Sequence, residues 1–325
     1  MGINKLADLQ DMHQLIRKPL VERISNLYGT IKATGLGFSD HLQEHWLRMW
    51  EYSSAIMESK VDSRMRVLDA GGTGTVFSYY LSAEGCDVTT VDIDEKKVRD
   101  AAVMTKHLGL KMTHRLESLT ELSEGNESYD AVFCICVIEH IPAEQQAVAI
   151  RQLARVLRPG GMMSLTFDYG KYAADFPFKS KAEVEDRLIA PSGLAVVGGN
   201  FSDHADDYGT HLKNYTFGSL FLRKEGVLAL PLKRDSFPIM PFPALDRNIV
   251  KTRNFALEAS FFDSLRYNVR QDQLIGGLQQ ILAPDDFNKI KNLGHAEILK
   301  ILESSLAPEA ALALFDIFYG PKRDL

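Results

Sequence analysis

The stretch VLDAGGTGT, residues 67–75, combines residue types that could hold a nucleotide-like ligand. An apolar run typical of a strand leads directly into small residues, and glycine lets a backbone approach a ligand closely. A phosphate-binding loop would need a Gly-Lys-Ser/Thr ending, and no lysine follows. A dinucleotide fingerprint would need a third small residue where the helix meets the strand, but the frame set by Gly72 and Gly74 places Phe77 there. The loop therefore matches neither a phosphate-binding loop nor a dinucleotide-binding fingerprint.

Three further segments extend the pattern. VTTVDID is typical of a strand that ends in an acid, Asp92, 21 residues after Gly71. YDAVFCICVIEHI reads as a buried strand with a Glu-His ending. LARVLRPGGMMSLTFDY combines a helix, a Pro-Gly-Gly turn and a strand. With the loop at 69–75, these segments resemble the class I S-adenosylmethionine-dependent methyltransferases. That family's loop usually runs Asp-x-Gly-x-Gly-x-Gly; here the first glycine matches and the next two family positions are threonines. The resemblance covers residues 45–225.

The resemblance implies an S-adenosylmethionine site at the carboxyl edge of the sheet. Asp92 would accept hydrogen bonds from both ribose hydroxyls, although Asp is also common in turns. Gly71 would let the backbone approach the ligand, Thr73 would point its hydroxyl at the ligand, and Thr75 would cap the helix that begins at Val76. The cofactor-binding residues that the resemblance implies are Asp69, Gly71, Gly72, Thr73, Gly74, Asp92, Ile93, Glu117, Ser118 and Cys136.

Several residues at the strand ends have two open interpretations. Glu117 follows the strand KMTHRLE, where the family often places a contact to adenine, and it could equally be a solvated loop charge. His140 follows the fourth strand at the edge where ligands bind, so it could orient or deprotonate an acceptor, or pack at the start of a helix beside Glu139. Asp168 and Tyr169 end the fifth strand and would face the acceptor pocket or form a structural turn.

A rival motif lies before the loop. HLQEH, residues 41–45, matches the H-x-x-E-H zinc signature, with both imidazoles on one helical face. No partner site for a third ligand is identifiable, and so short a pattern arises easily by chance, so we expect no metal site. The nearby Trp46, Trp50 and Tyr52 are typical of helix packing, although one of these rings near a sulfonium would be favourable.

Strand and helix patterns alternate around these residues, from MRVLDA to MMSLTFDY. This alternation predicts an α/β fold with a doubly wound, mostly parallel seven-stranded sheet. No helix separates LAVVGGNF from NYTFGSLFLRKE, which predicts an antiparallel hairpin at one edge. Residues 3–28 space apolar side chains mostly at three- and four-residue intervals, which predicts an amphipathic helix interrupted near Pro19, and a second helix is expected over about 41–59.

Three regions follow from these patterns. Residues 1–44 are predicted to be an N-terminal helical lid, and residues 45–225 the S-adenosylmethionine-binding domain. Residues 226–325 are predicted to hold a linker and a C-terminal helical addition, because PLKRDSFPIMPFPALDR carries four prolines and residues 248–320 show helical periodicity.

Composition limits the classes of function. The 325 residues are 45% hydrophobic and 25% charged, as in globular proteins, and a net charge of -6 gives no general attraction to nucleic acid. No apolar run is long enough to span a membrane, and three cysteines suit a reducing cytoplasm. We expect a cytoplasmic methyltransferase that acts on an O, N or C atom of a small-molecule acceptor, with self-association through the helical additions left open. The alternatives are a non-catalytic binding or assembly protein and an NAD-dependent oxidoreductase. Phe77 and the predicted edge hairpin argue against the oxidoreductase.

Overall fold

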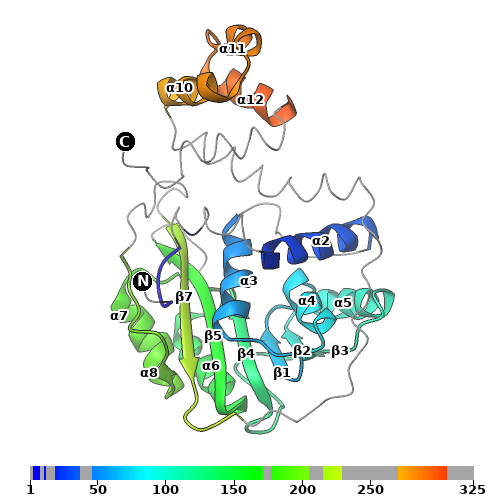
Figure 1. Ribbon diagram of the computed structural model, residues 1–325. Coiled ribbons are helices and arrows are strands. Elements are labelled where there is room, and N and C mark those ends of the chain that lie inside the picture. The colour runs from blue at the N-terminus through cyan, green and yellow to red at the C-terminus, as the bar shows by residue number, and fades with distance from the viewer. Residues whose placement is uncertain are drawn as a thin grey trace.

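A seven-stranded sheet forms the centre of the molecule (Figure 1). The computed structural model describes residues 3–7, 11, 19–36, 46–170, 177–204, 215–228 and 270–305. The strand order is β3-β2-β1-β4-β5-β7-β6. The strands are β1 (Arg66–Ala70), β2 (Asp87–Asp92), β3 (Met112–Leu116), β4 (Tyr129–Ile135), β5 (Leu157–Gly170), β6 (Ala195–Val196) and β7 (Tyr215–Arg223).

The pairing of the strands confirms the predicted doubly wound sheet. β1 to β5 are joined by parallel pairings, whereas β7 is antiparallel to both β5 and β6. β6 is shorter than the predicted run, with only two residues in the ladder. The strand order reverses between β1 and β4, so the loops that follow these two strands diverge and leave a crevice at their carboxyl ends.

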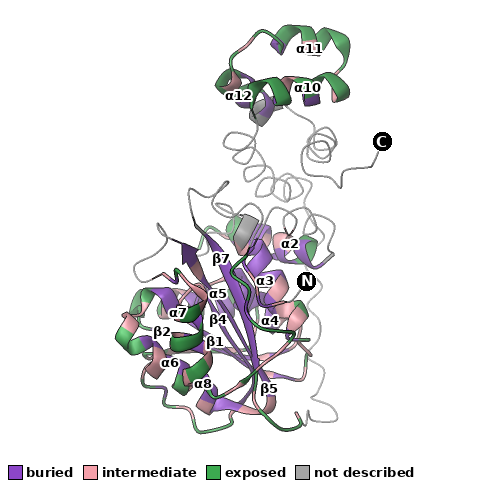
Figure 2. Cartoon of the chain, turned by 90° about the vertical axis from the view of Figure 1, so that its left-hand side faces the viewer, coloured by how far each residue is buried: buried purple, intermediate pink, exposed green. Residues whose placement is uncertain are grey.

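Helices cover both faces of the sheet (Figure 2). Val67 of β1 and Val88 of β2 contribute to one buried cluster, and Leu68 and Val91 of the same two strands contribute to the other, as expected for strands with two covered faces. The first face carries α2 (Pro19–Ala33), α3 (Trp46–Glu58), α4 (Val76–Ala83) and α5 (Glu95–His107). The second face carries α6 (Ala143–Val156), α7 (Lys181–Val184), the π-helical turn Glu185–Ile189 and α8 (Ala190–Ser192).

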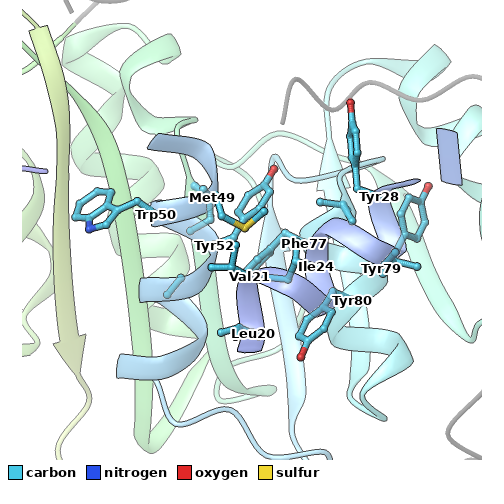
Figure 3. Packing of buried hydrophobic residues seen from close by; sticks show 14 of the residues in the cluster. Leu20, Val21, Ile24, Tyr28, Met49, Trp50, Tyr52, Phe77, Tyr79 and Tyr80 are labelled. Atoms are coloured by element: carbon cyan, nitrogen blue, oxygen red, sulfur yellow. The ribbon is translucent and has the colours of Figure 1, made fainter. Parts of the chain in front are cut away.

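Phe77 lies in the core where α3 and α4 meet the sheet (Figure 3). Its ring stacks on Tyr52 of α3 at a centroid distance of 5.1 Å and meets the Phe133 ring of β4 edge-on at 5.1 Å. Figure 3 also places Val21 and Ile24 of α2 beside Phe77, and all of these side chains are buried. A large aromatic ring thus fills the position at which a dinucleotide fingerprint needs a small residue.

Residues 3–7 are extended, so the predicted helix over 3–28 is wrong at its start. Leu6 pairs with Gly218 of β7 in an antiparallel bridge, and the Asn4 Oδ1 accepts a hydrogen bond from Phe221 N at 2.7 Å. Because β6 is so short, β7 would otherwise expose backbone groups on this side, and the N-terminal segment satisfies some of them. The helix α2 begins at Pro19, a residue suited to the first helical position.

The Pro-Gly-Gly turn also differs from its prediction. α6 ends at Val156, and the Pro-Gly-Gly residues 159–161 lie inside the strand β5 rather than at a helix stop. Gly160 has a φ of +78°, and its N–H donates to Lys224 O at 2.9 Å. A Cβ on Gly160 would lie 2.1 Å from Leu228 N, so the glycine is needed for the close approach of the chain after β7.

The described C-terminal residues are helical, as their periodicity predicts. They form α10 (Gln271–Ile281), α11 (Pro284–Ile290) and α12 (His295–Ser305), which lie beyond the end of the sheet in Figure 1. The HLQEH motif at 41–45 and the proline-rich segment 231–247 lie outside the described residues. Among the helices of the described segments, none combines the length and the apolar character needed to cross a membrane.

Candidate functional site

A cavity of about 510 Å³ lies at the carboxyl ends of β1, β2 and β4. Its walls come from the loop after β1, the ends of β2 and β3, the segment after β4, and α3. This is the crevice in which open α/β sheets bind ligands. The sequence-predicted site residues that line it are Asp69, Gly71, Gly72, Asp92, Ile93, Glu117, Ser118, Cys136 and His140.

The loop after β1 needs its first two glycines. Gly71 has a φ of +80°, and a Cβ there would lie 2.4 Å from the Val137 Cγ1. A Cβ on Gly72 would lie 2.1 Å from the Asp69 Oδ2. That carboxylate accepts a hydrogen bond from the Ser78 Oγ at 2.5 Å, which ties the loop to α4. Gly71 and Gly72 thus allow a compact loop whose backbone faces the cavity.

The two threonines of the loop both hydrogen bond within the protein, but only Thr75 also lines the cavity. The Thr75 Oγ1 accepts a hydrogen bond from Ser78 N and caps α4, as predicted. Thr73 is buried, and its hydroxyl hydrogen bonds to the Thr90 Oγ1 of β2 at 2.8 Å. Thr73 and Gly74 are not among the residues that line the cavity. The expectation that the Thr73 hydroxyl points at the ligand is therefore wrong, because a buried partner on the sheet holds it.

Asp92 ends β2 at the cavity and is 8% exposed. Its Oδ1 accepts a hydrogen bond from Asp94 N at 3.0 Å, which is the turn contact of the alternative interpretation. Its Oδ2 lies 3.8 Å from the Lys97 Nζ. The exposed Ile93 follows it and also lines the cavity. Asp92 thus makes a structural turn contact and forms part of the cavity wall.

The loop after β3 forms the next part of the wall. Both carboxylate oxygens of Glu117 accept hydrogen bonds from Ser123, one from its Oγ at 2.6 Å and one from its N–H at 3.2 Å. The Ser118 Oγ hydrogen bonds to the Thr120 Oγ1 at 2.7 Å. Glu117 therefore fixes the shape of its own loop as well as lining the cavity.

The chain after β4 carries a strained residue at the cavity. Cys136 has a φ of +50°, which is uncommon for a residue with a side chain, and its N–H donates to Thr166 O at 3.1 Å. His140 ends the short helix Ile138–His140, is exposed, and lines the cavity. Glu139 is buried, and its Oε1 accepts a hydrogen bond from Asp168 N at 3.0 Å. The Glu-His pair thus has one structural and one cavity-lining member.

A cluster of acids lies behind this wall. The Glu51 Oε1 of α3 is 3.0 Å from the Cys136 Sγ and also accepts a hydrogen bond from the Thr166 hydroxyl. Burial raises the pKa of Glu51, of Glu139 and of the Cys136 thiol, which favours their protonated forms. Ligand atoms of Cys136, Glu139 and Asp168 lie within 4.8 Å of one another, a spacing that a metal ion could bridge.

Asp168 and Tyr169 take structural positions. Asp168 belongs to the acid cluster, and the buried Tyr169 donates its hydroxyl hydrogen bond to the Asp203 Oδ2 at 3.1 Å. Neither residue is among those that line the cavity. The structure therefore agrees with the structural interpretation of these two residues rather than with a place at the acceptor.

The sequence analysis missed a cation from α3. Arg48 and Tyr52 both line the cavity, and their spacing of four residues puts them on one helix face. The Arg48 Nη1 lies 2.8 Å from the Glu51 Oε2, and its guanidinium lies 5.8 Å from the centre of the Phe217 ring. From the sequence, only the aromatic residues of this helix stand out. The signal that could have found Arg48 is a lone arginine on the same helix face as Tyr52.

Comparisons with known proteins agree with this geometry. Residues 67–161 match the family described as "Methyltransferase domain". The ubiquinone biosynthesis O-methyltransferase of Xanthomonas axonopodis pv. citri is 30% identical over 162 residues, which are 50% of this chain and 59% of that protein. The protein of the same name from Rickettsia akari is 33% identical over 100 residues, 31% of this chain and 39% of that protein. The matched part of this chain thus spans less than two thirds of the length of each of these curated relatives.

Among solved structures, a methyltransferase from Methanosarcina mazei superimposes with a TM-score of 0.43 at 17% identity, covering 52% of this chain and 97% of that one.

Proposed function

We propose that this chain transfers the methyl group of S-adenosylmethionine to a small-molecule acceptor, and the match of residues 67–161 to the methyltransferase-domain family supports this proposal. The observation that carries the proposal is that the loop after β1, Asp92 and the end of β4 line one cavity. The curated relatives are named O-methyltransferases, which favours a hydroxyl oxygen as the methylated atom.

The cofactor would lie along the cavity from β3 to α3. We assign Asp92 to the ribose hydroxyls, because a carboxylate accepts two strong hydrogen bonds from a diol. The adenine would lie between Ile93 and the loop that begins at Glu117. The backbone of the glycine loop and the N-terminus of α4 would receive the amino-acid end of the cofactor, since free N–H groups and the helix dipole favour a carboxylate. Tyr52 would then lie near the sulfonium.

The main role of the protein in this reaction would be to align the acceptor oxygen with the methyl group. When bound, S-adenosylmethionine would supply an activated methyl group: the acceptor oxygen would form an O–C bond to it as the S–C bond breaks with its electron pair moving to sulfur, which would leave S-adenosylhomocysteine as the second product. The protein holds the oxygen in line with this bond and excludes water. We assign His140 as the group that takes the hydroxyl proton, because it is the histidine at the cavity wall beside the end of β4.

The flanking regions would shape the acceptor side. We assign residues 45–225 as the methyl-transfer domain, with residues 1–44 as a lid and residues 226–325 as an addition that bears on acceptor choice or self-association. Within the methyl-transfer domain, α3 contributes Arg48 and Tyr52 to the cavity.

Ligand-dependent melting tests the proposal. At a hundredfold excess over the dissociation constant, binding adds about 2.7 kcal/mol, which corresponds to a shift of a few degrees. S-adenosylmethionine and S-adenosylhomocysteine should each raise the melting temperature, and NAD and ATP should not. A shift with NAD alone would overturn the proposal. Binding of S-adenosylmethionine without transfer to any tested phenol, alcohol or amine would favour the non-catalytic alternative.

A further inference from the structure

A chain of four buried or half-buried side chains runs from the cofactor loop to α5. The Thr73 Oγ1 lies 2.8 Å from the Thr90 Oγ1 of β2, and this hydroxyl lies 2.8 Å from the His114 Nδ1 of β3. On the other side of the imidazole, the His114 Nε2 lies 2.7 Å from the Thr105 Oγ1 of α5. The three distances are those of normal hydrogen bonds. The loop is thereby connected to a helix three elements away.

The sheet register explains why these groups meet. Asp69 of β1 pairs with Thr90 of β2, and Thr90 pairs with His114 of β3, so the three residues form one row across adjacent strands. The loop that follows Asp69 folds back over this row and places Thr73 beside Thr90. Thr73 and Thr90 are at most 1% exposed. Each hydroxyl in such a place must find a partner within the protein, and the row supplies one.

The protonation state of His114 decides the direction of the hydrogen bonds in this row. A neutral histidine offers one donor and one acceptor, so it can link two hydroxyls that point in the same sense. Burial lowers the pKa of His114 to about 4, so the ring is neutral at ordinary pH. Thr90, between two partners, can donate to one and accept from the other.

We propose that Thr73 is a positioning residue that fixes the cofactor loop through Thr90, His114 and Thr105. The proposal rests on the proposed function, because it names what holds the S-adenosylmethionine loop in its binding shape. Thr73 occupies a position where the resembled family has glycine, does not line the cavity, and sits between two glycines of positive φ, Gly71 and Gly74. Its side chain therefore anchors a loop that glycine alone would leave freer to move.

A loop held in its bound shape before the ligand arrives loses less entropy on binding. Thr73→Val keeps the shape of the side chain and removes the hydroxyl, whereas Thr73→Ser keeps the hydroxyl. We expect Thr73→Val to raise the Kd for S-adenosylhomocysteine about five- to tenfold, as loss of one buried hydrogen bond implies, and Thr73→Ser to restore most of the affinity. In the ligand-free protein, the amides of residues 71–75 should exchange with solvent faster in Thr73→Val than in the wild type.

Thr89→Val is the matched control. Thr89 is the neighbouring buried threonine of β2 and points to the opposite face of the sheet, so its hydroxyl is outside the row. This variant should lose some global stability and keep the wild-type Kd and the wild-type exchange of the loop amides. An equal loss of affinity in Thr89→Val and Thr73→Val would overturn the proposal, because the effect would then be one of general destabilisation.

The proposal stays testable if Thr73→Val does not fold or if the wild-type protein does not bind S-adenosylhomocysteine. If Thr73→Val does not fold, Thr105→Val breaks the far end of the row, and it should speed loop exchange and raise the Kd in the same direction by a smaller factor; no change in either measurement overturns the proposal. If the wild-type protein does not bind S-adenosylhomocysteine, the proposed function fails. The exchange of the loop amides in the ligand-free protein still tests the anchor by itself, and unchanged exchange in Thr73→Val overturns it.

Discussion

Gly72 lies so close to Asp69 that a Cβ at position 72 would fall 2.1 Å from the carboxylate oxygen Oδ2. The carboxylate occupies the space that any side chain at position 72 would need, and it is held there by the Ser78 hydroxyl. The loop before α4 is thus fixed by contacts inside the protein and not by its glycines alone. This relationship explains how a loop with two threonines at family glycine positions can still present its backbone to a ligand.

Gly72→Ala should displace the Asp69 carboxylate and break its hydrogen bond to Ser78. We expect the affinity for S-adenosylhomocysteine to fall at least tenfold and the melting temperature to drop, because a contact of this kind forces the backbone or the carboxylate to move. Calorimetric titration and thermal unfolding measure the two effects. Gly276→Ala is the control, since a Cβ there meets nothing within 4 Å, and it should leave both values near wild type. Wild-type affinity in Gly72→Ala would contradict the packing argument.

Asp92→Ala should remove most of the cofactor affinity. Charge-assisted hydrogen bonds contribute about 1.5–3 kcal/mol each, so the Kd for S-adenosylmethionine should rise by one to several powers of ten. Asp94→Ala serves as the control, because Asp94 caps α5 through Lys96 N and Lys97 N and does not line the cavity. That variant should lose about 1 kcal/mol of unfolding free energy and keep its affinity. Titration of both variants separates the roles, and equal affinities would remove Asp92 from the site.

His140→Ala should slow methyl transfer by about 10² to 10⁴ and leave the Kd for S-adenosylmethionine within a few-fold of wild type. The reason is that a base acts on the acceptor proton and contributes little to holding the cofactor. His140→Gln keeps a polar side chain of similar reach but cannot take the proton, and it should be equally slow. Turnover under saturating cofactor, measured with a hydroxyl acceptor, tests this. Unchanged turnover in both variants would return His140 to a packing role.

The sequence predicted the sheet because its buried strands are continuous apolar runs that alternate with helical periods, and a local pattern is enough to identify them. It also predicted the strand-end residues that meet at one edge, since parallel strands share their carboxyl end. It failed for residues 3–7, whose apolar spacing fits a helix but whose partners on β7 lie more than 200 residues away. Neither Glu51 nor the direction of the Thr73 hydroxyl could be predicted, because both depend on contacts between distant segments.

The unfolding free energy should depend on pH through His114. Burial lowers its pKa from 6.5 to about 4, so on acidification the unfolded chain takes up this proton before the folded protein does. The contribution of the neutral imidazole to the unfolding free energy is therefore complete above about pH 6.5 and is lost as the pH falls towards about 4.

Urea unfolding at several values between about pH 7 and about pH 4.5 measures how the unfolding free energy depends on pH. The wild type should lose unfolding free energy more steeply than His114→Gln over this range, since the variant lacks the titrating group while carboxyl groups titrate in both. Parallel curves for the wild type and His114→Gln would mean that the imidazole takes up its proton as readily in the folded protein as in the unfolded chain.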